Sequence, residues 1–118
     1  MKIFILITAI IELLAGVLLF LVPRQVPGFK NADSIATTWA SMYGAAAIGL
    51  GFFALQAWNY YADAEMVHSF LLTFIVFHAG VMAAAFRGSR AGLKDMTGVA
   101  ILHGILLLAT LYFYIQMR

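Results

Sequence analysis

The sequence predicts an all-α protein: an integral membrane bundle of four transmembrane helices that run up and down. Of its 118 residues, 64% are hydrophobic and only 10% are charged, whereas a soluble domain is roughly 45–50% apolar and about 25% charged. A short chain has too little interior to hide so much apolar surface from water. The apolar residues also gather into four runs of the length that crosses a bilayer. These observations exclude soluble globular and disordered classes.

The chain contains no cysteine. Its absence excludes a disulfide-stapled fold, iron–sulfur clusters and thiolate zinc sites. The seven Lys and Arg residues lie near the ends of the apolar runs, where they report orientation in a membrane rather than binding to nucleic acid. We therefore expect the lipid bilayer, and not nucleic acid, as a partner.

Each apolar run is expected to form one helix, because each is close to the roughly 20 residues that cross a hydrocarbon core. The runs lack the alternation of a strand and are too long for barrel staves. Short connections make successive helices antiparallel neighbours. We therefore expect a single domain over residues 1–118, with helices over residues 3–22, 35–58, 64–86 and 96–115.

The connections carry residues that begin and end helices. Pro23 ends the first run, and Pro27 and Gly28 with it forbid helix in the loop that follows. Short polar side chains at an N-cap accept hydrogen bonds from the free backbone N–H groups of the first turn. The predicted caps are Asp33 or Ser34 for the second helix, Asp63 for the third and Asp95 for the fourth.

Basic residues are divided unevenly between the two sides of the predicted bundle. The loops after the first and third helices carry five, and the opposite side carries two. Because cytoplasmic loops are enriched in Lys and Arg, these two loops are expected in the cytoplasm and both termini outside. The five are Arg24, Lys30, Arg87, Arg90 and Lys94, and the two are Lys2 and Arg118.

The second helix is rich in small side chains, which let helix backbones approach closely where lipid offers no hydrophobic drive. One interpretation is tight packing inside the bundle. Another is a face for a second copy of the chain or for a larger membrane complex. These residues are Ala36, Ala40, Gly44, Ala47, Gly51 and Ala54, with Ala45 and Gly49 beside them.

One polar side chain on each helix is predicted to lie at a common depth. Ionisable groups in hydrocarbon are costly, by about 2.5–3.5 kcal/mol at a helix centre. Counted from the helix ends on one side at about 1.5 Å per residue, all four lie roughly 12–15 Å below the same surface. His68 precedes His78 by ten residues and is expected near the opposite interface. The four predicted ligand-binding residues are Glu12, Tyr43, His78 and His103.

Several chemistries could use this layer. Glu12, His78 and His103 form the ligand set of a facial-triad metal site, although no Glu-x-x-His motif is present. Haem b between the two histidines would need splayed helices, since packed helices lie only about 8–10 Å apart. Glu12 with a histidine can also act as an acid–base pair. The remaining interpretation is hydrogen bonding that fixes helix register, and we expect no metal or cofactor.

Four short segments carry a family resemblance. They are IELLAGVLLFLVP in the first helix, MYGAAAIGLGFFAL in the second, FHAG in the third and LHGILLL in the fourth. In these segments the chain resembles the DoxX-like group of small four-helix bacterial membrane proteins. Some distant relatives of that group isomerise or bind sterol-like lipids, so the resemblance implies a ligand cavity between the helices. It also implies the cytoplasmic membrane of a bacterium as the location.

The expected function is that of a multi-pass membrane protein that binds a small lipophilic molecule at the polar layer. Two alternatives stay open. One is an accessory or structural subunit that packs through its second helix into a larger membrane complex. The other is a membrane-embedded isomerase that uses Glu/His acid–base chemistry, with Glu12, His78 and His103 as candidate catalytic residues.

Overall fold

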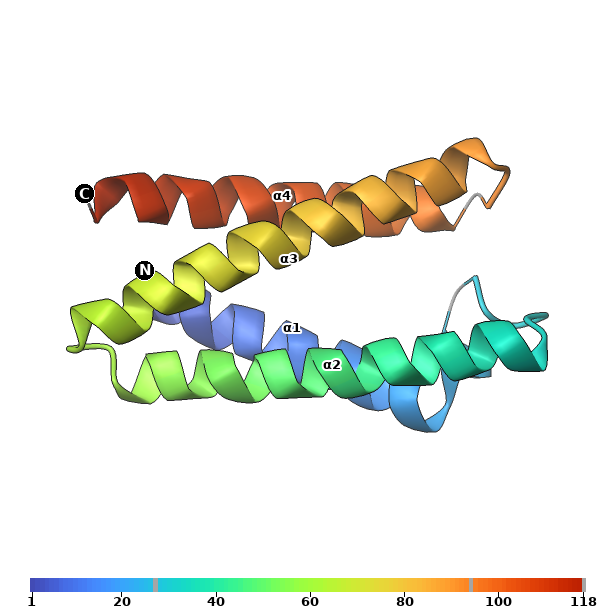
Figure 1. Cartoon of the computed structure of the whole chain (residues 1–118), viewed down its shortest axis with the longest axis horizontal. Coiled ribbons are helices and arrows are strands. Elements are labelled where there is room, and N and C mark those ends of the chain that lie inside the picture. Colours follow the sequence, from blue (N-terminus) through green and yellow to red (C-terminus); the bar gives the residue numbers. More distant parts are fainter. Residues whose placement is uncertain (27, 94, 118) are drawn as a thin grey trace. The chain divides into compact units, whose positions relative to one another are not determined.

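The computed structural model describes residues 1–26, 28–93 and 95–117, and this part of the chain is helical, with no strand. Pro27, Lys94 and Arg118, which entered the loop and charge predictions, lie outside the described residues. The all-α prediction with four long helices is confirmed. The elements, shown in Figure 1, are α1 (Lys2–Leu21), the short 3₁₀ helix η1 (Pro23–Gln25), α2 (Ser34–Asn59), α3 (Ala64–Arg90) and α4 (Met96–Gln116).

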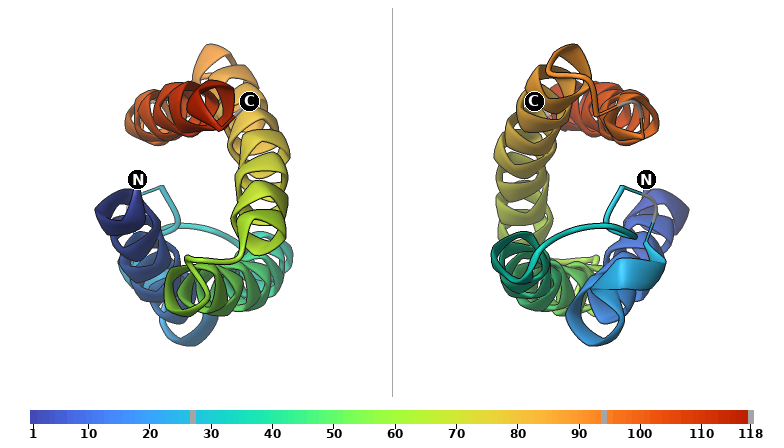
Figure 2. Two further views of the ribbon diagram at one scale, coloured as in Figure 1. Left: turned by 90° about the vertical axis from the view of Figure 1, so that its left-hand side faces the viewer. Right: turned by 90° about the vertical axis from the view of Figure 1, so that its right-hand side faces the viewer.

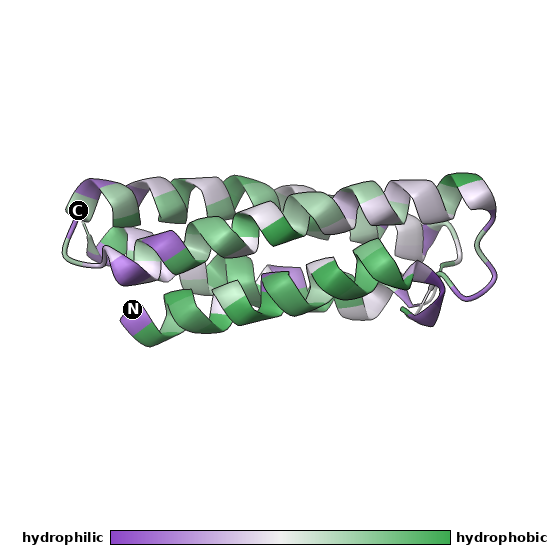
Figure 3. Ribbon diagram, turned by 90° about the horizontal axis from the view of Figure 1, so that it is seen from below, coloured by the Kyte–Doolittle hydropathy of each residue, from purple (hydrophilic) through white to green (hydrophobic). Residues whose placement is uncertain are grey.

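All four α-helices are long and apolar enough to cross a membrane. They contain 20, 26, 27 and 21 residues, and most of the hydrophilic colour in Figure 3 lies near helix ends. Each helix also exposes large apolar side chains in its middle; four of these are Leu14 (62% exposed), Phe52 (60%), Val76 (73%) and Leu108 (69%). Exposed apolar surface of this extent is typical of a protein that contacts a membrane or another protein.

The third helix extends to Arg90, four residues beyond its predicted end. Its last turn holds Arg87 and Arg90, at the end where the helix dipole favours cations. The helix ends where Ala91 N donates to the carbonyl of Arg87 at 3.0 Å and Gly92 adopts a φ of +97°, a conformation that favours glycine. Hydropathy placed the end of the third helix too early, because a last turn that carries arginines is not apolar but still forms helix.

The first loop contains a short helix that the sequence did not predict. η1 begins at Pro23, and Val26 N donates to the carbonyl of Pro23 at 3.0 Å. The prediction that this loop forbids helix is wrong for residues 23–25. Proline is compatible with a first helical turn, because the N–H it lacks would have no intrahelical partner there.

Aspartate side chains cap two of the helices as predicted. Asp33 accepts a hydrogen bond from Ala36 N at 2.7 Å, and Asp63 accepts two from the first turn of α3 at 3.0 and 3.1 Å. Asp95 is the N-cap residue of α4, but its side chain makes no capping hydrogen bond. The cap is therefore confirmed by position at all three helices and by hydrogen bonding at two.

α1 and α2 form an antiparallel pair within one compact unit, residues 1–60 (Figures 1 and 2). A methyl group at Gly44 would lie 2.5 Å from Phe20 N and 2.7 Å from the carbonyl oxygen of Gly16. The two backbones are therefore in direct contact. At the other end of the pair, Lys2 Nζ lies 5.5 Å from the ring centre of Trp58. The buried face of α2 consists of small residues only: Ala40, Gly44, Ala47, Gly51, Ala54 and Ala57.

α3 and α4 form a second antiparallel pair, within the unit formed by residues 61–118. Contacts run from Ser89, whose hydroxyl lies 2.6 Å from that of Thr97, to His68, whose ring centre lies 5.1 Å from that of Tyr114. α3 buries mostly bulky side chains. Its buried residues are Val67, Phe70, Leu71, Phe74, His78 and Ala85.

Gly44→Ala is expected to destabilise the α1–α2 pair, because the added methyl meets backbone atoms that cannot move aside. Overpacking of this kind costs about 1–3 kcal/mol. Gly49→Ala is the matched control on the same helix, since a methyl there has nothing within 4 Å and alanine favours helix. Denaturant unfolding of both variants in detergent micelles measures the difference. Equal stability of the two variants would contradict the backbone contact.

Candidate functional site

The structure brings two of the predicted site residues together, His78 of α3 and His103 of α4. Their Nδ1 atoms lie 3.0 Å apart, within hydrogen-bond distance, and their ring centres are 5.2 Å apart. Both side chains are buried, with 0% and 7% of their surface exposed. These two residues, hereafter the histidine pair, lie at one depth along the α3–α4 pair as predicted.

Aromatic rings surround the histidine pair. The ring centres of Phe74 and Phe77 lie 5.4 and 5.3 Å from that of His78, and Phe77 lies 5.8 Å from His103. Phe74 and His78 are one turn apart on α3 and therefore share a face. The rings restrict both imidazoles and make their surroundings apolar, so a charge on either imidazole would be costly.

One edge of the histidine pair has no partner among the residues that the structure describes. His78 Nε2 is buried, and no hydrogen bond to it exists within the described part of the chain. A buried polar atom left without a partner costs about 1–3 kcal/mol. The two Nδ1 atoms of the pair are thus hydrogen-bonded to each other, and His78 Nε2 can make a further hydrogen bond.

The contact between the rings limits which cofactors fit between them. Imidazoles in direct hydrogen-bond contact at 3.0 Å leave no space for a porphyrin plane. A metal ion could be held by both Nδ1 atoms, since metal–nitrogen bonds of about 2.0–2.1 Å can span this separation. Zinc sites in proteins use three or four protein ligands, so the histidine pair would supply two of them and at least one more would be needed.

Glu12 lies on the buried face of α1, one turn after Thr8 and one turn before Gly16. Glu12 is buried, with 2% of its surface exposed. Glu12 Oε1 and Thr8 Oγ1 are both buried without a hydrogen-bond partner among residues 1–26, 28–93 and 95–117. Thr8 was not a predicted site residue. The signal that could have found it is its position four residues before Glu12, on the same face of an otherwise apolar helix.

The backbone of Tyr43 lies at a different level of the α1–α2 pair from that of Glu12. Gly44 packs opposite Phe20, and Gly51 packs opposite Leu13, so the backbone of Tyr43 is about eight residues, or roughly 12 Å, from the level of Glu12. The predicted common depth assumed that the helices end together. α2 has 26 residues against 20 in α1, and the counts from the two helix ends therefore do not correspond.

His68 is not part of the histidine pair. It lies ten residues before His78 on α3, is half-buried, and has its ring against that of Tyr114. This position agrees with its expected place toward the end of the helix.

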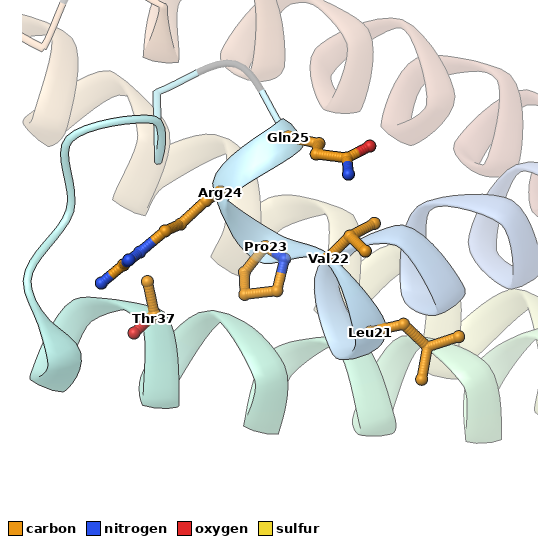
Figure 4. A pocket seen from close by; sticks show the side chains of 6 residues that line it. All are labelled: Leu21, Val22, Pro23, Arg24, Gln25 and Thr37. Carbon is orange, nitrogen blue, oxygen red and sulfur yellow. The ribbon is translucent and has the colours of Figure 1, made fainter.

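An open pocket of 320 Å³ lies where α1 ends and α2 begins (Figure 4). In Figure 4 the side chain of Arg24 extends toward Thr37 of α2. Leu21 is nine residues beyond Glu12, or about 13 Å along a helix, so this pocket is separate from the buried polar groups of α1. Its lining consists of Leu21, Val22, Pro23, Arg24, Gln25 and Thr37.

Comparison with known proteins adds no family to these observations. No family model matches the chain, and neither the search of curated proteins nor that of solved structures found a match. The resemblance to the DoxX-like group therefore stays a prediction.

His78→Phe and His103→Phe are expected to destabilise the protein non-additively. Each single change keeps a ring but leaves the other imidazole with an unsatisfied nitrogen, at about 1–3 kcal/mol. The double change removes both polar atoms, so its cost should be clearly less than the sum. Unfolding of the four proteins in detergent gives the coupling free energy.

His68→Phe supplies the control for this cycle. Its ring is also aromatic-packed, but it lies about 15 Å along the helix from His78, so its effect should add to that of His103→Phe. If the effects of His78→Phe and His103→Phe were also additive, the Nδ1–Nδ1 contact would contribute nothing to the free energy of unfolding.

Proposed function

We propose that this chain is a multi-pass membrane protein that binds a small lipophilic molecule at an intramembrane polar site. The observation that carries this proposal is the histidine pair. Two imidazole rings are in contact between the apolar helices α3 and α4, and His78 Nε2 remains buried without a partner in the described residues.

The membrane part of the proposal rests on the helices. Four of them have the length and composition of a membrane span, and large apolar side chains are exposed along their middles. Lipid offers no hydrogen bonds to a backbone, and a helix satisfies its backbone internally. A bilayer is the solvent in which such surfaces are favourable.

The ligand part rests on the polar atoms inside these helices. In hydrocarbon, a polar group is favourable only when another polar group, of the protein or of a bound molecule, gives it a hydrogen bond. A ligand with an apolar body and one polar end meets that need, since binding sites combine apolar walls with a few polar contacts. Phe74 and Phe77 supply such walls beside His78. Glu12 and Tyr43 belong to the proposed site through the depth predicted from sequence.

The accessory-subunit alternative needs a helix face that remains open to a partner. The main small-residue face of α2 packs on α1. Ala45, Ala46 and Gly49 are exposed, and a methyl at Gly49 meets nothing within 4 Å. A partner helix would therefore use this second small-residue face, and Gly49→Leu should then disrupt association without unfolding the chain.

Orientation in the membrane can be tested with reporter fusions. The basic residues predict cytoplasmic loops after α1 and α3, with both termini outside. A reporter inserted after Gly92, which is exposed, should report the cytoplasm, and a fusion after residue 118 the opposite compartment. A cytoplasmic signal from the C-terminal fusion would reverse the assignment, and equal signals from both would contradict a membrane crossing by α4, the one predicted span between the two reporters.

Glu12→Gln is expected to lower the occupancy of a co-purified lipophilic molecule by about tenfold to a hundredfold while the fold is kept. The loss of a buried hydrogen-bond partner costs about 1–3 kcal/mol, and each 1.4 kcal/mol is a factor of about ten. Native mass spectrometry of protein purified in mild detergent measures the occupancy. Adding His103→Ala should cost little further binding, because both changes disable one site.

Glu65→Gln is the matched control, since Glu65 is an exposed carboxylate in the first turn of α3. It should leave occupancy unchanged. Wild-type protein that carries no small molecule under these conditions, or two variants that lose binding equally, would remove the support for a ligand site at Glu12.

A further inference from the structure

The geometry of the histidine pair fixes a relation between its two outer nitrogens. The Nδ1 atoms of His78 and His103 are 3.0 Å apart, so one of them carries a proton and donates it to the other. A neutral imidazole carries one N–H, on either Nδ1 or Nε2. The donor ring therefore has a bare Nε2 that accepts, and the acceptor ring has an Nε2–H that donates.

Within the unit formed by residues 61–118, the surroundings of the pair favour two neutral rings. Both side chains are buried, and the closest aromatic rings are those of Phe74 and Phe77. A charge in apolar surroundings is costly unless a counter-charge faces it, and the faces of α3 and α4 around the pair carry no acidic residue: the acidic residues of the described part of this unit, Asp63, Glu65 and Asp95, lie at helix starts. With two neutral rings, the complementarity of the outer nitrogens follows.

We propose that the histidine pair is a tautomer-coupled recognition element for lipophilic molecules that carry a carbonyl or a hydroxyl group. The proposal rests on the proposed function and names the chemistry of the ligand. His78 Nε2, buried and unpartnered in the described residues, makes the contact. It donates to a carbonyl when His103 is the Nδ1 donor, and it accepts from a hydroxyl when His78 is the Nδ1 donor.

Exchange between the two states leaves the number of protons on the pair unchanged. One proton crosses from Nδ1 of one ring to Nδ1 of the other. A second leaves Nε2 of the ring that has just gained a proton, and a third arrives at Nε2 of the ring that has just lost one. Water that enters with the ligand accepts the second proton and supplies the third. The same exchange gives the pair a bifunctional acid–base capacity, because one Nε2 takes up a proton while the other releases one.

The test is the tautomeric state of each histidine in protein labelled with ¹⁵N-histidine and held in lipid nanodiscs. The chain has three histidines, so two-bond ¹H–¹⁵N correlation spectra are simple to assign with His68→Phe and His103→Phe. Without added ligand, one member of the pair should show Nδ1–H and the other Nε2–H. His68 lies outside the pair and is the internal control.

Two added probes should move the pair in opposite directions. 2-Undecanone only accepts hydrogen bonds, so it should raise the fraction of His78 in the Nε2–H form above one half, with His103 changing to Nδ1–H. 4-Octylphenol donates, so it should lower that fraction below one half and reverse His103. Undecane, which has no polar group, should change neither ring, and His68 should not respond to any of the three.

Several results would overturn the proposal. Both rings in the Nε2–H form would show that the Nδ1 atoms do not share a proton, as when both bind a metal ion. An imidazolium on either ring would remove the complementarity. Binding of ketone and phenol without opposite shifts would leave a lipophilic site in place but refute tautomer coupling, which separates failure here from failure of the proposed function. Absence of any response to either probe would show that His78 Nε2 does not meet a ligand.

Discussion

In the membrane that we propose for this chain, helices with apolar outer surfaces gain little free energy from burying more apolar surface against one another, and this constraint governs how the helices associate. Lipid is as apolar as a leucine side chain, so helix association depends on close packing and on the few polar contacts available. The two helix pairs meet this constraint differently. α1 and α2 touch through backbone at Gly44 and Gly16. α3 and α4 combine an aromatic core with a buried hydrogen bond between His78 and His103.

The two solutions differ in what they leave for function. A glycine contact provides close packing and offers no polar side-chain atom, so the α1–α2 contact at Gly44 contributes shape alone. An imidazole contact satisfies one nitrogen of each ring and leaves the other edge available. The hydrogen bond that joins α3 to α4 therefore also prepares a polar atom, His78 Nε2, in apolar surroundings. Structure and proposed recognition use the same two side chains, which is why their mutational effects should be coupled.

Much of the fold was predictable because membrane-span length and capping chemistry are local. The four helices, and the caps at Asp33 and Asp63, follow from runs and single residues. The meeting of His78 and His103 was also predictable, because a short loop joins their helices and both were counted from that loop. Tyr43 and Glu12 are separated by a longer connection that includes η1, and helices of unequal length shift their register. Depth counted from a helix end is reliable only where both helices end together.

The two buried threonines clarify what an unpartnered oxygen on α1 means. On α4, Thr110 donates to the carbonyl of Leu106 at 2.7 Å, the usual way in which a threonine satisfies its hydroxyl inside an apolar helix. Thr8 on α1 has the same option one turn earlier. Its Oγ1 nevertheless makes no hydrogen bond within the described residues, and neither does Oε1 of Glu12 one turn later. Thr8 could donate to a backbone carbonyl of its own helix but does not. The polar face of α1 is therefore suited to a hydrogen-bonding group from outside this helix, as a ligand-binding face requires.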